Sequence, residues 1–376
     1  MNKHNANSLR RKTYEHRLVE KYKGAIVPFN PVEHHPLVDS FKDGSFGHST
    51  SAFALYSHGH KKNAHSAFAP FGLIYHDGGV MFSMGYFRRE LDGKDYLVLT
   101  APKIKEGDAQ EAVRKVVNFV NEILAQTDIS GVYVRFLDLH HYLHFLNAGF
   151  LPAKEHPWHP EAPEEDEHLN YSKIDLNAFF ERGTIKSRYP RLQVNRFRNY
   201  LQRSKASLAL HETSKDANVI AQETELARGI VSVHFSFLEK MGKAISSSFE
   251  DYLNLTDHLI WNLPPVFTHI GWLYDPEAGL NIPVSFSLGE QLSSTTAALY
   301  CLVALRPQLI GEETRGKNAL IKYSHHLLFR DLYGRGIETV HIGGSEHPDL
   351  NWAKRKWGAE LNPTYWCVKI SGPRGI

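Results

Sequence analysis

The sequence has few cysteines and no long hydrophobic run. Its only cysteines are Cys301 and Cys367, which excludes a disulfide framework and favours a reducing compartment. Two buried, unreactive thiols are the preferred interpretation, with a single bridge as the alternative. No apolar stretch approaches the roughly 18 residues of a membrane span, and the N-terminal segment has no apolar signal-peptide region. We therefore expect a soluble, cytoplasmic protein.

The sequence also has little net charge and lacks several catalytic motifs. Its formal charge of +2 is too small to attract a polyanion, so any contact with nucleic acid or phosphate needs a local basic patch. No GxSxG, P-loop or HExxH segment is present. Serine hydrolases, nucleoside triphosphatases and zinc peptidases therefore have no local signature here.

Length and composition indicate two folded domains. The chain has 376 residues, of which 42% are hydrophobic and 22% charged, enough to bury two cores of usual size. We place the first domain at residues 1–175 and the second at 176–376. The second includes a basic connecting helix and the expected donor site.

The two halves of the sequence repeat one order of elements. In the first half, apolar stretches at 51–58, 68–87 and 95–101 are interpreted as short strands joined by hairpins, with a glycine-rich turn at 77–79. In the second half, strands are expected at 266–275, 282–291 and 295–305. Each half continues with a long helix, a strand, a short helix and a terminal strand, from 108–176 and from 316–370. The short helices end alike, in "LNAGFLPA" and "RKWGAELNP". This pattern predicts an α/β (α+β) fold built from a duplicated unit with mixed sheets flanked by helices.

A basic segment joins the halves. In "SRYPRLQVNRFRNYLQRS", residues 187–204, the helical stripe of Val194, Phe197 and Leu201 is narrow, and arginines cover most of the remaining surface. Arginine presents a planar fork that matches phosphate oxygens. Arg188, Arg191 and Arg198 are therefore candidate phosphate-binding residues, with ion pairs to the acidic loop at 163–167 as the alternative.

These elements resemble the Fem-type (FemABX-like) tandem acyltransferases, whose two units have the GNAT fold. The resemblance spans residues 50–370 in element order and is carried by the arginine-rich helix and by "DLNWAKRKWGAE" at 349–360. Leu350, Lys354, Trp357 and Gly358 match the family's C-terminal signature, whereas Ala353 replaces its usual aromatic residue. The resemblance implies tandem GNAT-like domains and transfer of an acyl group from aminoacyl-tRNA or acyl-CoA.

The resemblance also implies roles for residues of the second half. Lys354 would stabilise a donor phosphate or a developing oxyanion, with a solvated basic helix as the alternative. Weaker catalytic candidates, as general bases, are Glu290, His341 and Tyr300. A CoA-binding turn needs small residues and free amides, so the candidate donor-binding residues are Arg306, Arg315, Gly316 and Lys317. Asn318 stands where a second glycine is expected, and an ordinary surface loop is the alternative.

The 23 histidines suggest metal binding only weakly. His140 and His144 fall at i and i+4 of the short helix, a spacing that can chelate zinc, and His58, His60 and His65 form a second group. Neither group has a cysteine pair or an HExxH motif. We therefore expect no metal site and no tightly bound cofactor, with acyl-CoA possible as a co-substrate.

Together these observations predict a GNAT-superfamily acyltransferase. It would transfer an acyl or aminoacyl group from aminoacyl-tRNA or acyl-CoA to an amine- or hydroxyl-bearing acceptor. The alternative is a non-catalytic module on the same scaffold, which would bind nucleic acid or an anionic surface through the arginine-rich helix.

Overall fold

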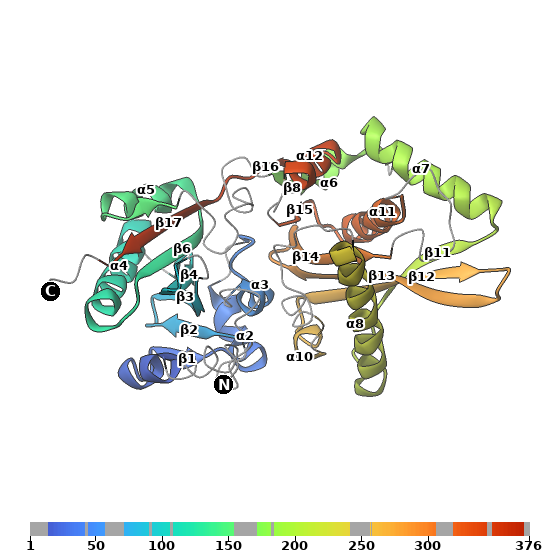
Figure 1. Ribbon diagram of the computed structural model, residues 1–376. Coiled ribbons are helices and arrows are strands. Elements are labelled where there is room, and N and C mark those ends of the chain that lie inside the picture. The colour runs from blue at the N-terminus through green and yellow to red at the C-terminus, as the bar shows by residue number, and fades with distance from the viewer. Residues whose placement is uncertain are drawn as a thin grey trace. The chain divides into compact units, whose positions relative to one another are not determined.

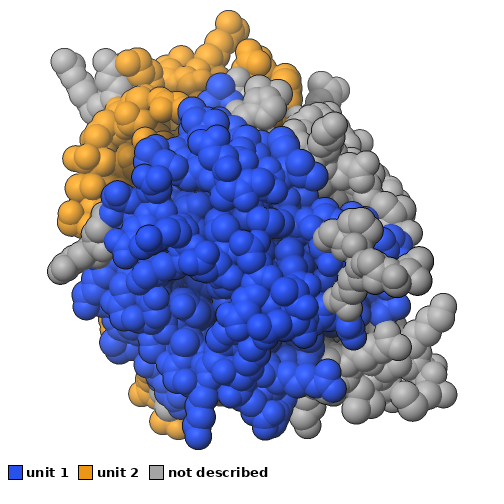
Figure 2. All heavy atoms as spheres, turned by 90° about the vertical axis from the view of Figure 1, so that its left-hand side faces the viewer, with its two compact units in different colours: residues 1–170, 344–348, 361–376 blue, residues 171–343, 349–360 orange. Residues whose placement is uncertain are grey.

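The computed structural model describes residues 14–41, 44–56, 71–89, 92–105, 108–153, 171–181, 184–240, 256, 258–305, 319–343 and 348–371. The chain divides into two compact units (Figures 1 and 2). Unit 1 comprises residues 1–170, 344–348 and 361–376, and unit 2 comprises residues 171–343 and 349–360. The predicted α/β fold with two mixed sheets is confirmed.

The sheet of unit 1 contains eight strands. Seven of them lie in the order β1 (Ile26–Pro28), β2 (Leu73–His76), β3 (Val80–Arg88), β4 (Asp95–Thr100), β6 (Gly131–Leu137), β17 (Tyr365–Ile370) and β7 (Leu151–Pro152). The short strand β5 (Lys103–Ile104) pairs with β3. The helices of this unit are α2 (Pro31–Ser40), α3 (Thr50–Tyr56), α4 (Ala109–Gln126) and α5 (Leu139–Asn147).

The sheet of unit 2 repeats this arrangement with seven strands. Their order is β11 (Ser207–Glu212), β12 (Val266–Asp275), β13 (Leu280–Gln291), β14 (Thr296–Ala304), β15 (Thr339–His341), β8 (Tyr171–Asp175) and β16 (Glu360–Leu361). A separate pair is formed by β9 (Phe180–Glu181) and β10 (Thr184–Ile185). The helices are α6 (Leu176–Phe179), α7 (Arg188–Arg203), α8 (Ala217–Lys240), α10 (His258–Trp261), α11 (Ala319–Gly334) and α12 (Pro348–Lys356).

The strand directions of the two sheets also agree. In each sheet the first four strands are antiparallel neighbours, the fourth and fifth are parallel, and the fifth and sixth are antiparallel. The duplication indicated by the sequence is therefore present at the level of topology.

The two sheets exchange their sixth strands along the chain. We expected the strand at 171–176 to complete the first half and the strand at 365–370 to complete the second. Instead β8 pairs with β15 in unit 2, and β17 pairs with β6 in unit 1. In both sheets, the exchanged strand pairs antiparallel with the fifth strand, which itself pairs parallel with the fourth. Because the two sheets offer the same kind of neighbour, the local sequence does not determine which sheet each strand joins.

The cores form as the helical periodicity predicts, with one early exception. The α4 helix is capped by Asp108, whose side chain accepts a hydrogen bond from Glu111 N at 2.8 Å. The helix buries Val113, Val116 and Val120.

The strand predicted at 51–58 is wrong, because Thr50–Tyr56 forms α3. Ser49 Oγ accepts a hydrogen bond from Ala52 N, as helix-initiating serines do, and a short apolar run alone fits either element.

The two short helices end in the same way. After α5, Phe150 N donates to Phe145 O, and after α12, Ala359 N donates to Lys354 O, both at 3.1 Å. Gly149 and Gly358 precede these donors with φ of 81° and 89°, a backbone conformation that favours glycine. The similar endings seen in the sequence therefore reflect one helix-terminating motif used twice.

Candidate functional site

The parallel strands of unit 2 separate where the candidate site begins. β14 pairs with β15 only through Thr296, Ala297 and Ala298, which face Thr339, Val340 and His341. β14 then continues to Ala304, while β15 ends at His341. Past Ala298, the described residues of β15 do not extend the ladder.

A β-bulge lies at the same point. On β13, Leu288 pairs with Cys301 and Gly289 pairs with Leu299, so the register between β13 and β14 shifts by one residue at Tyr300. A Cβ atom at Gly289 would overlap the ring of Phe267 and lie 2.5 Å from Ala298 O. Glycine is therefore required where β12, β13 and β14 approach closely.

Lys354 lies beside the end of β15. Its ammonium donates hydrogen bonds to Ile342 O at 3.2 Å and Gly343 O at 2.8 Å, and the side chain is partly buried. In the matched ending of α5, the equivalent residue is Phe145, which is fully buried in the core of unit 1. The duplicated helix thus accommodates an apolar residue at this position, and unit 2 has a cation there.

Three further side chains complete what we call the Lys354 cluster: Lys322, His325 and Trp357. The Lys322 ammonium lies 5.0 Å from the centre of the Trp357 ring, and the His325 ring lies 5.6 Å from it. Trp357 is 3% exposed, and its indole N–H has no hydrogen-bond acceptor in the described structure. The cluster is therefore rich in donors and positive charge.

Burial sets the protonation of the cluster. It lowers the pKa of the Lys322 ammonium to about 8, and no carboxylate among the described residues counters this effect. Burial, reinforced by the charges of Lys322 and Lys354, lowers the pKa of His325 to about 3. His325 Nδ1 lies 2.8 Å from Ile321 O and must donate to it, which leaves Nε2 of the neutral ring as an acceptor. Such a site suits an anion or a developing oxyanion.

The other predicted catalytic residues lie on the sheet itself. Glu290, Ala298 and His341 occupy one row across β13, β14 and β15, so their side chains project from the same face. Val340 points to the opposite face, into the core that includes residues of α11. The structure therefore brings Glu290 and His341 to the face opposite α11, whereas Lys354 lies close to His325 of α11.

These three predicted residues are largely enclosed by the protein. Glu290 is 1% exposed, and Tyr300 is also buried. Burial, and then the charge of Lys173 on the neighbouring strand, lowers the pKa of His341 to about 4. His341 is consequently neutral at physiological pH.

The predicted arginine-rich helix is present as α7. Val194, Phe197 and Leu201 are buried on its inner side, as the periodicity predicts. Arg188, Arg191, Arg196, Arg198 and Arg203 are all exposed. Arg198 bonds Asn195 and Arg203 bonds Asn199 O, but in the described part of the chain no arginine of α7 pairs with a carboxylate. The helix thus presents unneutralised positive charge.

The candidate donor-binding residues Arg306, Arg315, Gly316 and Lys317 lie outside the described residues, as does the group of His58, His60 and His65.

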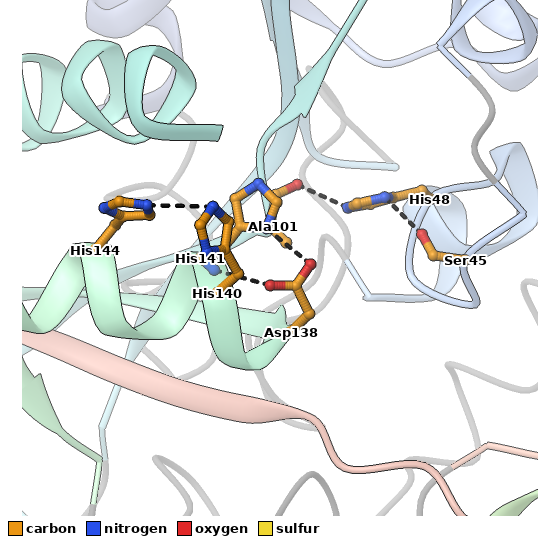
Figure 3. A network of polar contacts seen from close by, with 7 residues as sticks. All are labelled: Ser45, His48, Ala101, Asp138, His140, His141 and His144. Carbon is orange, nitrogen blue, oxygen red and sulfur yellow. Dashed lines mark hydrogen bonds and ion pairs between the residues drawn. The ribbon is translucent and has the colours of Figure 1, made fainter. Parts of the chain in front are cut away.

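The other histidine group, His140 and His144, is visible in Figure 3. Nε2 of His140 and Nε2 of His144 lie 3.3 Å apart on exposed turns of α5. Asp138 bonds His141 at 2.9 Å and initiates the helix. The residues that the structure describes contain no group of three or more metal-ligating side chains.

The sequence missed Lys322 and His325. Both fit an ordinary amphipathic helix, and only the contact of α11 with Trp357 after α12 reveals their common environment. The weak signal available was the spacing of three residues that places them on one helix face.

No helix in the described part of the chain has the length and apolar character needed to span a bilayer.

Comparison with known proteins gives structural matches alone. The sequence matches no model of a known protein family and no curated protein. A conserved protein of unknown function from Bacteroides thetaiotaomicron is 11% identical with a TM-score of 0.59, covering 91% of this chain and 98% of the other. FemX is 13% identical with a TM-score of 0.53, covering 91% and 96%. The C-terminal domain of a putative lysylphosphatidylglycerol synthetase from Agrobacterium fabrum is 13% identical with a TM-score of 0.52, covering 91% and 92%.

These likenesses extend over nearly the whole chain and both units. Together with the repeated strand order, they show that this chain of two α/β units shares the fold of FemX.

Proposed function

We propose that the protein is an acyltransferase of the GNAT superfamily. It transfers an acyl or aminoacyl group from aminoacyl-tRNA or acyl-CoA to an amine- or hydroxyl-bearing acceptor at the Lys354 cluster. One observation carries the proposal. At equivalent positions in the two units, unit 1 has the buried Phe145, whereas unit 2 has Lys354, whose ammonium donates a hydrogen bond to Gly343 O. The fold shared with FemX and with a putative lysylphosphatidylglycerol synthetase supports it.

The chemistry needs little from the protein beyond positioning and charge. Both donors present an activated ester or thioester, whose carbonyl carbon is attacked by the acceptor's amine or hydroxyl. The carbonyl oxygen becomes negative in the tetrahedral intermediate, and fixed cations and N–H donors stabilise it. Lys354, Lys322 and the Trp357 indole N–H supply that environment.

The remaining candidates have separate places in the proposal. Arg306, Arg315, Gly316 and Lys317 are proposed to bind a phosphate of the donor. They precede α11 in the sequence, and the first turn of that helix contains Lys322. We propose Glu290, His341 and Tyr300 as groups that orient or deprotonate the acceptor, with Glu290 and His341 on the sheet face opposite α11.

The test is a donor screen with the full-length chain. Purified protein is incubated with acyl-CoA or aminoacyl-tRNA and a panel of amine and hydroxyl acceptors, and mass spectrometry detects the acylated product and free donor. Transfer that falls at least about 100-fold in Lys354→Met supports the proposal, because the loss of one oxyanion donor has that size. The matched control is the neighbouring exposed Arg355→Met. Equal rates in both variants would contradict the role of Lys354.

A second candidate function rests on α7. Exposed arginines without carboxylate partners suit binding of an RNA backbone by a non-catalytic module. Salt-sensitive RNA binding that is lost in Arg191→Gln/Arg198→Gln, without acyl transfer to any acceptor, would favour this candidate over the enzyme.

A further inference from the structure

Unit 1 contains a serine and a histidine in hydrogen-bond contact, whereas the Lys354 cluster belongs to unit 2. Ser45 and His48 lie in the loop between α2 and α3, and Ser45 Oγ is 2.6 Å from His48 Nδ1. On the other side of the ring, His48 Nε2 is 2.9 Å from Ala101 O, just after β4. Figure 3 shows the imidazole between these two oxygens.

The two contacts fix the tautomer of His48. A backbone carbonyl can only accept, so Nε2 must have the proton that it donates to Ala101 O. In the neutral ring, Nδ1 then has a lone pair and accepts the hydroxyl proton of Ser45. A hydroxyl bonded to an imidazole whose other nitrogen is held by a third group is the arrangement that activates serine nucleophiles.

The surrounding structure holds this pair firmly. Lys103 is 2% exposed, and its ammonium donates to Phe41 O at 2.6 Å and to His48 O at 3.0 Å, which ties both ends of the loop. His48 is 7% exposed. Ser45 is only half-buried. The base is therefore enclosed, while the hydroxyl is on the more open side of the pair.

The loop packs against Phe136 near the end of β6, and a buried arginine lies over the same ring. Gly47 lies so close to Phe136 that a Cβ atom there would be 2.8 Å from the ring. The guanidinium of Arg135, which is 2% exposed, lies 4.1 Å from the Phe136 ring centre and 4.5 Å from that of Trp366. Loop, cation and aromatic rings thus form one packed group.

This group occupies a corresponding place in the duplicated fold. Arg135 pairs with Thr100, the last residue of β4, in the parallel ladder of unit 1. In unit 2, the equivalent parallel ladder of β14 and β15 leads to the carbonyl groups that hold Lys354. Both units therefore place a cation where their parallel strands end, buried Arg135 in unit 1 and partly buried Lys354 in unit 2. The loop of unit 1 adds the Ser45–His48 pair.

We propose that Ser45 is a nucleophile that accepts an acyl group from an activated carboxylic ester or thioester. Ser45 Oγ attacks the carbonyl carbon, and its proton passes to His48 Nδ1. The tetrahedral intermediate then expels the alkoxide or thiolate, which takes that proton from His48. One ester bond forms at Ser45, one ester or thioester bond breaks, and His48 returns to its neutral form.

The probe is p-nitrophenyl acetate, applied to the full-length protein. Release of p-nitrophenolate is followed by absorbance, and intact-mass measurement with peptide mapping locates the acetyl group. We expect one acetyl group on Ser45 and its loss in Ser45→Ala. Ser40→Ala is the matched control, because Ser40 Oγ is exposed and donates to Leu37 O. His48→Gln should slow acetylation about 100-fold or more, the usual contribution of a general base.

A folded variant is needed for a clear result. Circular dichroism and thermal unfolding establish that Ser45→Ala is native, and Ser45→Cys gives a second readout. Its thiol should react with iodoacetamide faster than the same thiol in Ser45→Cys/His48→Gln. Acetylation that persists in Ser45→Ala, or folded wild-type protein that leaves Ser45 unacetylated, would overturn the proposal. Lys354→Met should leave Ser45 acetylation unchanged, so the two sites are tested independently.

Discussion

Lys354 of α12 and Phe145 of α5 occupy equivalent positions in two helices that end with the same backbone motif. Phe145 is fully buried in an apolar core, whereas the Lys354 ammonium bonds the last carbonyl groups beyond β15. Because the fold accepts phenylalanine at this position, the lysine is not required to terminate the helix. The positive charge of the Lys354 ammonium is therefore the reason to propose a site there.

This comparison makes a prediction that separates function from stability. Lys354→Met keeps most of the side-chain volume and removes the charge, so we expect a small change in unfolding free energy, within about 1.5 kcal/mol. Acyl transfer should fall by a factor of about 100 or more. Urea unfolding and steady-state kinetics measure the two effects. A variant that unfolds at much lower urea would instead indicate a mainly structural lysine.

The pKa of Lys322 predicts a pH-dependent effect on stability. Its folded value of about 8 lies below the ordinary 10.5, so the buried ammonium destabilises the fold. That cost is full below pH 8 and declines as pH rises toward 10.5, because the unfolded chain then binds more protons than the folded chain. Lys322→Met should therefore unfold at higher temperature than wild type at pH 7, and the difference should shrink by about pH 10.

The matched control for this effect is Lys356→Met, because Lys356 is exposed on α12. Its difference from wild type should not change over the same pH range. Thermal unfolding at each pH, recorded for both variants and for wild type, supplies the comparison. A constant difference for Lys322→Met would show that its ammonium is not desolvated.

The sequence predicted the repeated fold better than it predicted the pairing of strands. Hydrophobic periodicity is local, and it correctly indicated α4, α7 and the similar endings of α5 and α12. The exchange of β8 and β17 depends on which of two similar sheets each strand joins, and neighbouring residues do not determine that choice. For the site, the motif indicated Lys354, but the association of Lys322 and His325 with Trp357 arises only from packing between helices.

The bulge at Gly289 predicts a strong asymmetry between two glycine substitutions. Gly289→Ala would force a methyl group against Phe267 and Ala298 O, a buried overlap that we expect to cost about 1–3 kcal/mol or more. Gly334→Ala meets nothing within 4 Å at the end of α11 and should be neutral or slightly stabilising. Urea unfolding measures both. Equal stability of the two variants would contradict the close approach of β12, β13 and β14.

The cysteines predict how each unit responds to denaturant. Cys301 lies in unit 2 and Cys367 in unit 1, and both are free and buried, as the sequence indicated. Burial raises the pKa of both thiols, so neither should react with a thiol reagent until its own unit opens. Labelling with Ellman's reagent at increasing urea, followed by peptide mapping, should assign each reactive step to one unit. Fast labelling of either cysteine in native buffer would contradict its burial.

The strand exchange predicts which unit a C-terminal deletion destabilises. Removing residues 365–376 deletes β17, which lies between β6 and β7 in the sheet of unit 1 and contributes Cys367 to the core under α4. Peptides from α4 and β6 should therefore exchange their amide hydrogens rapidly in the truncated protein. Cys301 in β14 should stay unreactive, because β8 completes the sheet of unit 2. Loss of protection in β14 with retention in β6 would show that the C-terminal strand belongs to the other sheet.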